Sequence, residues 1–476
     1  MKSRRIFIKD MVAVGAAVGL SPLFSHAGPA VNTHGNKEAE PFFHACENGE
    51  LEMARKLLSS NKELLIAKDT LGRTGFVLAM LAGHKDIGEF LKQSGYQTDL
   101  HEAALDQDWD RYDALVGEES STTQSMINAF HPMGGTVMWA AAAGGAGADM
   151  WRIYAKCGDP NAAQENNTAP IQKALLYHDL ATAELTAAAI LSNNTNPNPA
   201  GNEELPPLHI AAMRGSHVMV EMLIRLGADV MRKDQNGKTA VQMVESAGNE
   251  GIVTLLNEHY KIPRTHRTSR TAFDIDGNPY NPPSFEDVPL YLRRRLVGQA
   301  HGNLEYVQKT VKADPRMAHC VATTSEICVE ACAHIGNKKI VEFLIKNGAP
   351  YSLPTAVMLN DFTTVKKLLE EDAKRIEERG AHDFGLLWYP VIGRCDLDMM
   401  QLLLDKGAKI EQQHFLGTTA LHWACMRDQI EMVELLVQNG ADVNRVGRKF
   451  SATGETPLQS AKDEKIVNYL RTKGAK

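Results

Sequence analysis

The sequence predicts an all-α solenoid, which is a stack of similar helix-turn-helix units that each pack mainly on their neighbours. Three recurring patterns carry this prediction. Units open on a phrase of leucine, histidine and paired small residues: Leu100 to Ala104, Leu208 to Ala212 and Leu421 to Cys425. About ten residues later, apolar residues recur at i, i+3 and i+4, which marks one face of a second helix: Val220/Leu223/Ile224, Val341/Leu344/Ile345, Met400/Leu403/Leu404 and Val433/Leu436/Val437. A glycine then ends the helix, since glycine adopts the left-handed conformation at low cost: Gly227, Gly348, Gly407, Gly440 and Gly474.

The first element along the chain is an export signal over residues 1–27. Arg4 and Arg5 precede Lys9 and an uncharged apolar stretch, and Ser25 and Ala27 place small residues at the −3 and −1 positions of a signal-peptidase site, with Ala30 as the second choice for cleavage. The pattern is similar to the twin-arginine signals of bacteria, which export folded proteins. We therefore expect cleavage after Ala27, a periplasmic or extracellular location, and no stable membrane anchor after cleavage, because the apolar stretch is shorter than the roughly 20 residues that span a bilayer.

Repeat units follow a short N-terminal segment, 28–39, and fill 40–257 and 285–476. When each unit is anchored at the first position of its opening phrase, about thirteen units result, near positions 40, 74, 98, 136, 169, 206, 239, 293, 327, 351, 386, 419 and 456. An unusually short unit occurs early in both blocks, at 74–98 and at 327–351. This match predicts two similar blocks that arose by duplication, with equal helix numbers in 74–135 and 327–385; the alternative is independent drift of ordinary repeats.

A unit of about 33 residues with this opening phrase resembles the ankyrin repeat, and the resemblance covers nearly all of the chain after residue 39. It implies that His101, His209 and His422 tie neighbouring turns by hydrogen bonds, and that the paired alanines let helices approach closely. It also implies binding of another protein rather than catalysis. We expect that partner to be an unidentified envelope or extracellular protein, and the chain itself to be a monomer.

Residues 258–284 depart from the repeat pattern and predict a linker or an elongated finger. Asp274, Asp276 and Asn278 match the first ligand positions of a calcium loop, but Pro279 and Phe285 stand where that loop needs glycine and glutamate. A tight turn fits these residues better than a calcium site. Residues 445–455, with Arg445, Arg448 and Lys449, predict a second, basic finger.

Composition excludes several function classes. Asp and Glu outnumber Lys and Arg by 58 to 51, for a net charge of −7, and no long basic block suits a nucleic acid. Cys328 and Cys332 share a helix face, but no second pair completes a zinc set, and the alanine positions of Cys46, Cys332 and Cys425 predict core packing. No nucleophile, base and acid occur at a spacing along the sequence that indicates a catalytic set. We therefore expect no catalytic residue, metal or cofactor.

Partner binding is expected on the exposed face of the first helices, because stacking joins those positions into one concave surface. Transferred position by position, this selects seven residues: Glu47, Asn48, Met213, Arg214, Trp423, Met426 and Arg427. Trp423 is the strongest of them, since aromatic and arginine side chains dominate binding hot spots; the alternative is that it packs on a neighbouring unit. A rival function is an envelope enzyme or ligand-binding protein whose site lies in 258–284.

Overall fold

The computed structural model describes residues 39–163, 168–193, 195–199, 205–245, 247–262, 283–322, 326–414, 416–448 and 454–476. Across these residues the protein is an all-α repeat solenoid, with isolated β-bridges as its only extended pairings. The proposed signal with Arg4, Arg5 and Ala27, the acidic turn at 274–278 and most of the 258–284 insertion lie outside the described residues.

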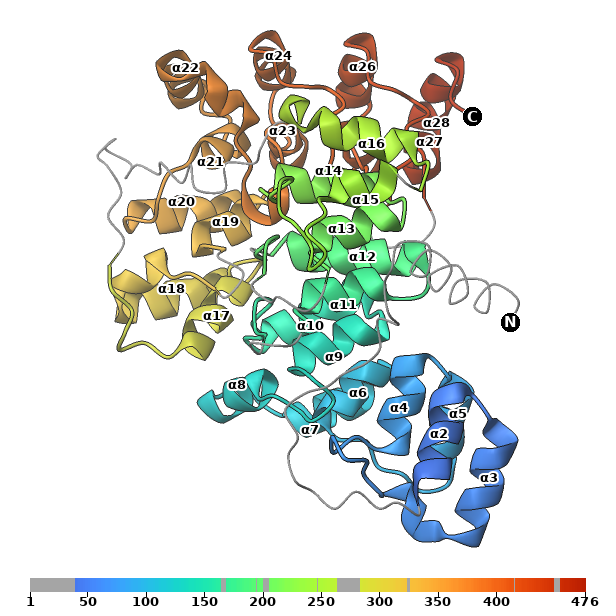
Figure 1. Ribbon diagram of the computed structural model, residues 1–476. Helices are drawn as coiled ribbons and strands as arrows, with labels where there is room; N and C mark the ends of the chain where they lie inside the picture. Colours follow the sequence, from blue (N-terminus) through green and yellow to red (C-terminus); the bar gives the residue numbers. More distant parts are fainter. Residues whose placement is uncertain are drawn as a thin grey trace.

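The helices form successive antiparallel pairs (Figure 1). In the first block these are α2 (Glu40–Asn48) and α3 (Leu51–Ser60), α4 (Gly75–Ala82) and α5 (Lys85–Gln93), α6 (Leu100–Asp106) and α7 (Trp109–Val116), then α8 (Ser121–Asn128), α9 (Val137–Gly144) and α10 (Met150–Ala155), α11 (Pro170–Leu176) and α12 (Leu180–Leu191), α13 (Pro207–Met213) and α14 (His217–Arg225), α15 (Ala240–Glu245) and α16 (Glu250–Asn257). In the second block they are α17 (Leu290–Gln299) and α18 (Leu304–Ala313), α19 (Cys328–Ala333) and α20 (Lys338–Lys346), α21 (Leu353–Met358) and α22 (Phe362–Glu371), α23 (Trp388–Gly393) and α24 (Leu397–Asp405), α25 (Ala420–Met426) and α26 (Ile430–Gln438), α27 (Pro457–Ser460) and α28 (Glu464–Thr472). The 3-10 helices are η2 (Lys62–Leu65), η3 (Gly147–Asp149), η4 (His259–Lys261), η5 (Pro315–His319), η6 (Ala373–Glu377) and η7 (Ala381–Asp383).

Local chemistry fixes where the second helix of a pair begins and ends. Its N-cap is commonly an Asn, Asp or Ser whose side chain accepts a hydrogen bond from the backbone N–H three residues on, as at Asp108, Asp179, Ser216, Asn249, Asn303, Asn337 and Asp361. The predicted glycine stops are confirmed, since Gly227, Gly348, Gly407, Gly440 and Gly474 all have φ between 86° and 95°. The predicted apolar faces are also confirmed, and Val220, Leu223, Val341, Leu344, Val433 and Leu436 are each 0% exposed.

The histidines of the opening phrase tie each unit to the next turn, as the resemblance implies. The Nε2 atoms of His101, His209 and His422 donate to the backbone carbonyls of Ala129, Lys238 and Glu455 at 2.9, 3.0 and 3.1 Å. These carbonyls belong to the hairpin turns between units, where single β-bridges such as Lys233 with Thr239 close the finger. These three histidines therefore have a structural role.

The two blocks share their helix order at the start but then differ. Three helix pairs open each block, and a 3-10 helix, η2 or η5, follows the first pair in both. After the third pair the first block continues with α8, whereas the second has only η6 and η7. The expectation of equal helix number in 74–135 and 327–385 is therefore wrong, because positive φ angles at His382 and Asp383, 54° and 66°, prevent a regular helix there.

The array returns on itself instead of forming an open arc. In Figure 1 the helices α17–α28 curve around α9–α16, while α2–α5 extend away from them. Each block has its own apolar core, and Leu416 of the second block belongs to the core of the first. Arg295 joins α17 to Glu119 at 2.8 Å, and Arg225 of α14 joins Asp383 at 2.7 Å. Part of the face expected to be concave and open is thus covered by the second block.

Candidate functional site

The structure separates the predicted binding residues into exposed and internal ones. Glu47 and Asn48 are exposed at the end of α2, and Met213 is only half-buried. Arg214, by contrast, donates to the carbonyls of Leu175, Tyr177 and His178 in the preceding unit. Burial lowers the pKa of its guanidinium. Arg214 therefore holds two units together and is not free to bind a partner.

Trp423 is 7% exposed and lies in the core of the second block. Its ring meets Phe384 edge-on at 5.2 Å and lies 6.2 Å from the ring of His414. The expectation that Trp423 anchors a partner at the surface is wrong, because the ring fills space between neighbouring units.

Arg448 of the predicted basic finger also points inward. Arg448 forms an ion pair with Glu184 of α12, and its backbone N–H donates to Leu416 at 2.9 Å. Both charged side chains are largely buried, at 18% and 9% exposure. Arg448 therefore connects the two blocks, while Lys449 lies outside the described residues.

Arg427 is half-buried and donates to the Ile392 carbonyl at 3.5 Å, and it lines a shallow, open groove that we call the basic groove. The groove runs across the inter-helix turns of the pairs α19–α20, α23–α24 and α25–α26, and its lining residues are Ile335, Gly336, Asn337, Lys338, Lys339, Ile392, Gly393, Arg394 and Arg427. Four of these side chains are cationic and none is a carboxylate. Arg394 is exposed, and Arg427 lies 5.7 Å above the Trp423 ring, which positions its guanidinium. Met426, the neighbouring predicted residue, is half-buried against the core.

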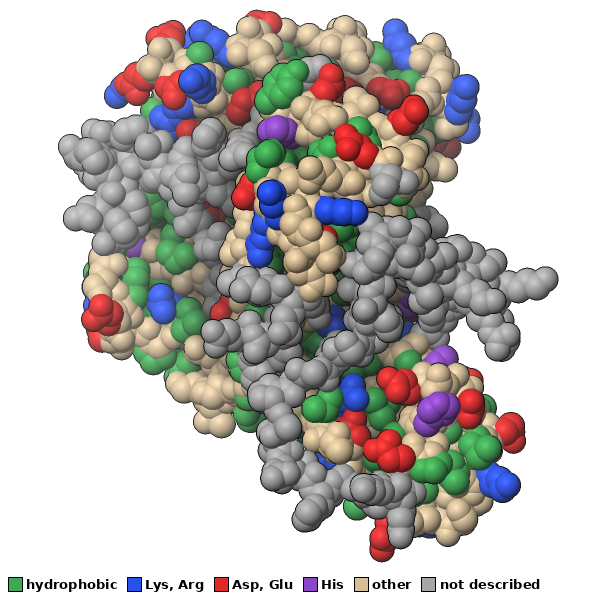
Figure 2. Space-filling view, viewed as in Figure 1, with side chains coloured by type: hydrophobic (Ala, Val, Ile, Leu, Met, Phe, Trp, Pro, Cys, Tyr) green, Lys and Arg blue, Asp and Glu red, His purple; other side chains and the backbone are tan. Residues whose placement is uncertain are grey.

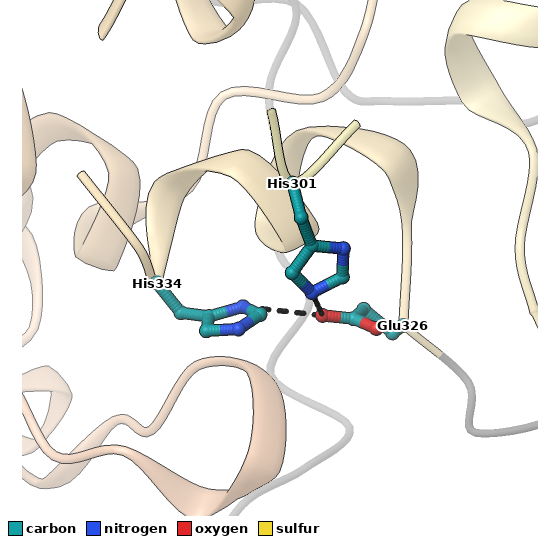
Figure 3. Close-up of side chains that lie close together, drawn as sticks. All are labelled: His301, Glu326 and His334. Carbon is teal, nitrogen blue, oxygen red and sulfur yellow. Dashed lines mark ion pairs between the residues drawn. The ribbon is translucent and has the colours of Figure 1, made fainter. Parts of the chain in front are cut away.

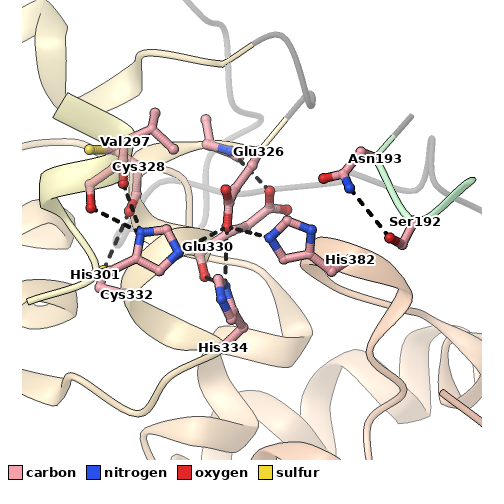
Figure 4. A network of polar contacts seen from close by, with 12 residues as sticks. Ser192, Asn193, Val297, His301, Glu326, Cys328, Glu330, Cys332, His334 and His382 are labelled. Carbon is pink, nitrogen blue, oxygen red and sulfur yellow. Dashed lines mark hydrogen bonds and ion pairs between the residues drawn. The ribbon is translucent and has the colours of Figure 1, made fainter. Parts of the chain in front are cut away.

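A second cluster brings three imidazoles around one carboxylate, and we call it the histidine cluster (His301, Glu326, His334 and His382). Glu326 Oε1 lies 3.1 Å from His334 Nδ1, 3.3 Å from His382 Nε2 and 3.9 Å from His301 Nε2. Figure 3 shows the rings of His301 and His334 turned toward the carboxylate, and Figure 4 shows His382 on the side of Glu326 opposite to His301.

The positions of these residues follow from the repeat. His301 follows α17, Glu326 precedes α19, His334 caps the C-terminus of α19, and His382 lies in η7. Burial alone would raise the pKa of Glu326, but the charge of His382 and the close contacts of the His334 and His382 imidazoles bring that pKa well below its usual value. Burial and the neighbouring His334 lower the pKa of His301, although Glu326 opposes this shift. The cluster therefore favours an ionised carboxylate beside a neutral His301.

Comparison with known proteins gives the identity of the units. A family model described as ankyrin repeats, three copies, matches residues 161–266, 353–446 and 387–476. The chain contains ankyrin repeats. Among the described helices of this ankyrin array, none is both long and apolar enough to cross a membrane.

Its relatives match through a limited part of their length. The chain is 31% identical to protein glp-1 of Caenorhabditis elegans over 142 residues, which is 27% of this chain and 11% of that protein. It is 38% identical to the B-cell lymphoma 3 protein homolog of Mus musculus over 80 residues, 17% of each. It is 33% identical to protein PhlB of Serratia liquefaciens over 110 residues, 23% of this chain and 46% of that protein. The chain thus spans less than half of each of these relatives' length.

Sequence reasoning missed the histidine cluster, although one signal was present. His301 and His334 lie 33 residues apart and both follow the first helix of an ankyrin unit. Equivalent positions in adjacent units face one another across the stack. Glu326 and His382 could not be added to this pair from spacing, because they lie in turns whose path is set by tertiary contacts.

Proposed function

We propose that the protein is a non-catalytic scaffold that binds an acidic segment of another protein in the basic groove. Ankyrin repeats generally mediate protein–protein binding, and repeat stacking presents such surfaces across several units. The basic groove carries the proposal: Lys338, Lys339, Arg394 and Arg427 line it without a carboxylate among them. On the face shown in Figure 2, charges of both signs are interspersed over α22–α28, so a groove whose charged side chains are all cationic is a distinct feature.

Charge reversal in the basic groove tests this proposal. Partners are crosslinked and captured from an envelope fraction with the wild-type chain and with Lys338→Glu/Arg394→Glu. We expect capture to weaken about tenfold or more, roughly 1.4 kcal/mol, because both groove cations become like charges for an acidic partner. The matched control is Lys366→Glu/Lys367→Glu on the exposed face of α22. Equal loss in the control, or unchanged capture in the groove variant, contradicts the assignment.

We also propose that the twin-arginine pair Arg4 and Arg5 directs export of the folded chain to the periplasm. All seven cysteines are free thiols, as suits a chain that folds in a reducing compartment before export. Replacement of both arginines by lysine should leave the protein inside the cell, as measured by fractionation and immunoblot. Wild-type amounts in the periplasm of that variant would contradict the proposal.

A further inference from the structure

The histidine cluster has the composition of a metal site. We propose that His301, Glu326 and His334 bind a transition-metal cation of the Zn²⁺ class, with His382 beside the same carboxylate oxygen. This site is independent of the basic groove and of partner binding. It departs from the expectation from the sequence that the chain binds no metal.

The spacing of the donor atoms fits one ion. One ligand atom each from His301, Glu326 and His334 lies within 4.8 Å of the other two. A tetrahedral ion with bonds of about 2.1 Å separates its ligands by about 3.4 Å. The distances of 3.1 and 3.9 Å from Glu326 Oε1 to the two imidazoles bracket that value.

The ring of His301 is oriented as in a metal-binding histidine. His301 Nδ1 lies 3.1 Å from the carbonyl oxygens of Val297 and of Gly298, so Nδ1 carries the proton and donates it. Nε2 is then the ring nitrogen that faces Glu326 Oε1, at 3.9 Å. A backbone carbonyl on the far nitrogen is the usual way to orient a metal-binding histidine.

The carboxylate supplies a second observation. Glu326 is 4% exposed, and its Oε1 atom has no hydrogen-bond partner although two imidazole nitrogens lie within 3.3 Å. The contacts therefore have the distance of hydrogen bonds but not their angle. A buried carboxylate oxygen without an aligned donor is costly, and a bound cation would supply its partner.

The donor types select the class of ion. Imidazole and carboxylate together suit Zn²⁺ and the transition metals near it, whereas Ca²⁺ and Mg²⁺ require oxygen ligands.

Cys332 is close in sequence to His334, but its thiol donates to the carbonyls of Cys328 and Val329 at 3.4 and 3.2 Å, and burial raises the pKa of that thiol. Without a metal, His334 Nδ1 donates to the backbone carbonyl of Glu330 at 3.0 Å, and a cation bound at Nδ1 would replace that proton.

The site joins successive units of the second block. His301 belongs to the first pair, and Glu326 and His334 to the second, so one ion cross-links two ankyrin units. Access from solvent remains, because the side chains of His301 and His382 are 35% and 24% exposed. An ion that binds only the folded chain stabilises that chain, and the stabilisation grows with the logarithm of the ratio of the ion concentration to Kd.

The test uses the full chain without a histidine tag. After EDTA treatment and removal of the chelator, the chain is titrated with ZnCl₂ or MgCl₂. We expect about one Zn²⁺ per chain by titration calorimetry and elemental analysis, and a higher midpoint of thermal unfolding with Zn²⁺ but not with Mg²⁺. Glu326→Gln and His334→Gln should weaken Zn²⁺ affinity at least about 10–100-fold.

Controls separate this site from adventitious binding. His44→Gln removes an exposed imidazole on α2 and should retain wild-type affinity. If Glu326→Gln does not fold by circular dichroism, His301→Gln replaces it, because His301 is the most exposed of the proposed ligands. Absence of Zn²⁺ binding by the wild-type chain, or equal affinity in the folded ligand variants, overturns the proposal.

Discussion

Leu223 shows how a single residue reports on the helix register. It lies on the buried face of α14 and is 0% exposed. Leu223→Ala should lower the free energy of unfolding by about 2–5 kcal/mol, because the lost methyl groups leave a cavity between stacked units. Denaturant titration measures this change, with Lys473→Ala at an exposed position of the last turn as the near-silent control. A change of less than about 0.5 kcal/mol for Leu223→Ala would contradict the register.

His209 predicts a dependence of stability on pH. It is 0% exposed, Nε2 donates to Lys238, and Nδ1 is buried without a hydrogen-bond partner. Burial lowers its pKa below the ordinary value of 6.5, although the Lys238 carbonyl and Asp234 oppose the shift. Below pH 6.5 the unfolded chain therefore binds a proton that the folded chain does not. The free energy of unfolding is highest above that pH and falls as the pH decreases.

The free energy of unfolding is measured by urea titration at several pH values between about 7.5 and about 5, in the presence of EDTA. His209→Gln should be less stable than wild type at pH 7.5 but show a shallower pH slope, by at most about 1.4 kcal/mol per pH unit. His44→Gln, at an exposed position, should keep the wild-type slope. An unchanged slope in His209→Gln would mean that this histidine is not held neutral.

At the scale of elements, the sequence predicted the features that depend on residues close together along the chain, namely buried helix faces and helix ends. The buried faces of α14 and α26 follow from the 3.6-residue period, and the stop at Gly227 follows from the freedom of glycine at positive φ. The burial of Trp423 could not be read in this way, because Phe384, its partner, belongs to the preceding unit, after an irregular turn. The opening phrase predicts a helix but not what packs on its outer face.

The turn containing η7 is the element that departs furthest from the repeat. His382 and Asp383 are consecutive non-glycine residues in the left-handed region, which costs free energy at each position. The turn is held by contacts on both sides: the His382 carbonyl accepts from His414 Nε2 at 3.1 Å, and Asp383 pairs with Arg225. One strained turn thus supplies a residue to the histidine cluster and a residue to the contact between blocks.

At the scale of the whole molecule, the return of the array replaces an open arc with a closed contact between blocks. Arg225 and Asp383 lie 158 positions apart, and no local pattern links them. This is why the sequence predicted two similar blocks and an open concave surface but not their contact. Closure also explains why Arg448 faces inward, while the basic groove lies over turns that remain exposed.

The ion pair between Arg225 and Asp383 predicts how firmly the blocks are joined. The two side chains are 6% and 1% exposed, and Arg379 lies 3.4 Å from the same carboxylate oxygen. Asp383→Asn leaves two buried guanidinium groups without their shared counter-ion, which should cost about 3–5 kcal/mol. We expect a lower midpoint of thermal unfolding and a larger radius of gyration by small-angle X-ray scattering as the blocks separate. Glu371→Gln, which removes an exposed pair with Lys367, should change neither quantity. An Asp383→Asn chain that is as stable and compact as wild type would show that apolar contacts such as Leu416 hold the blocks together without this ion pair.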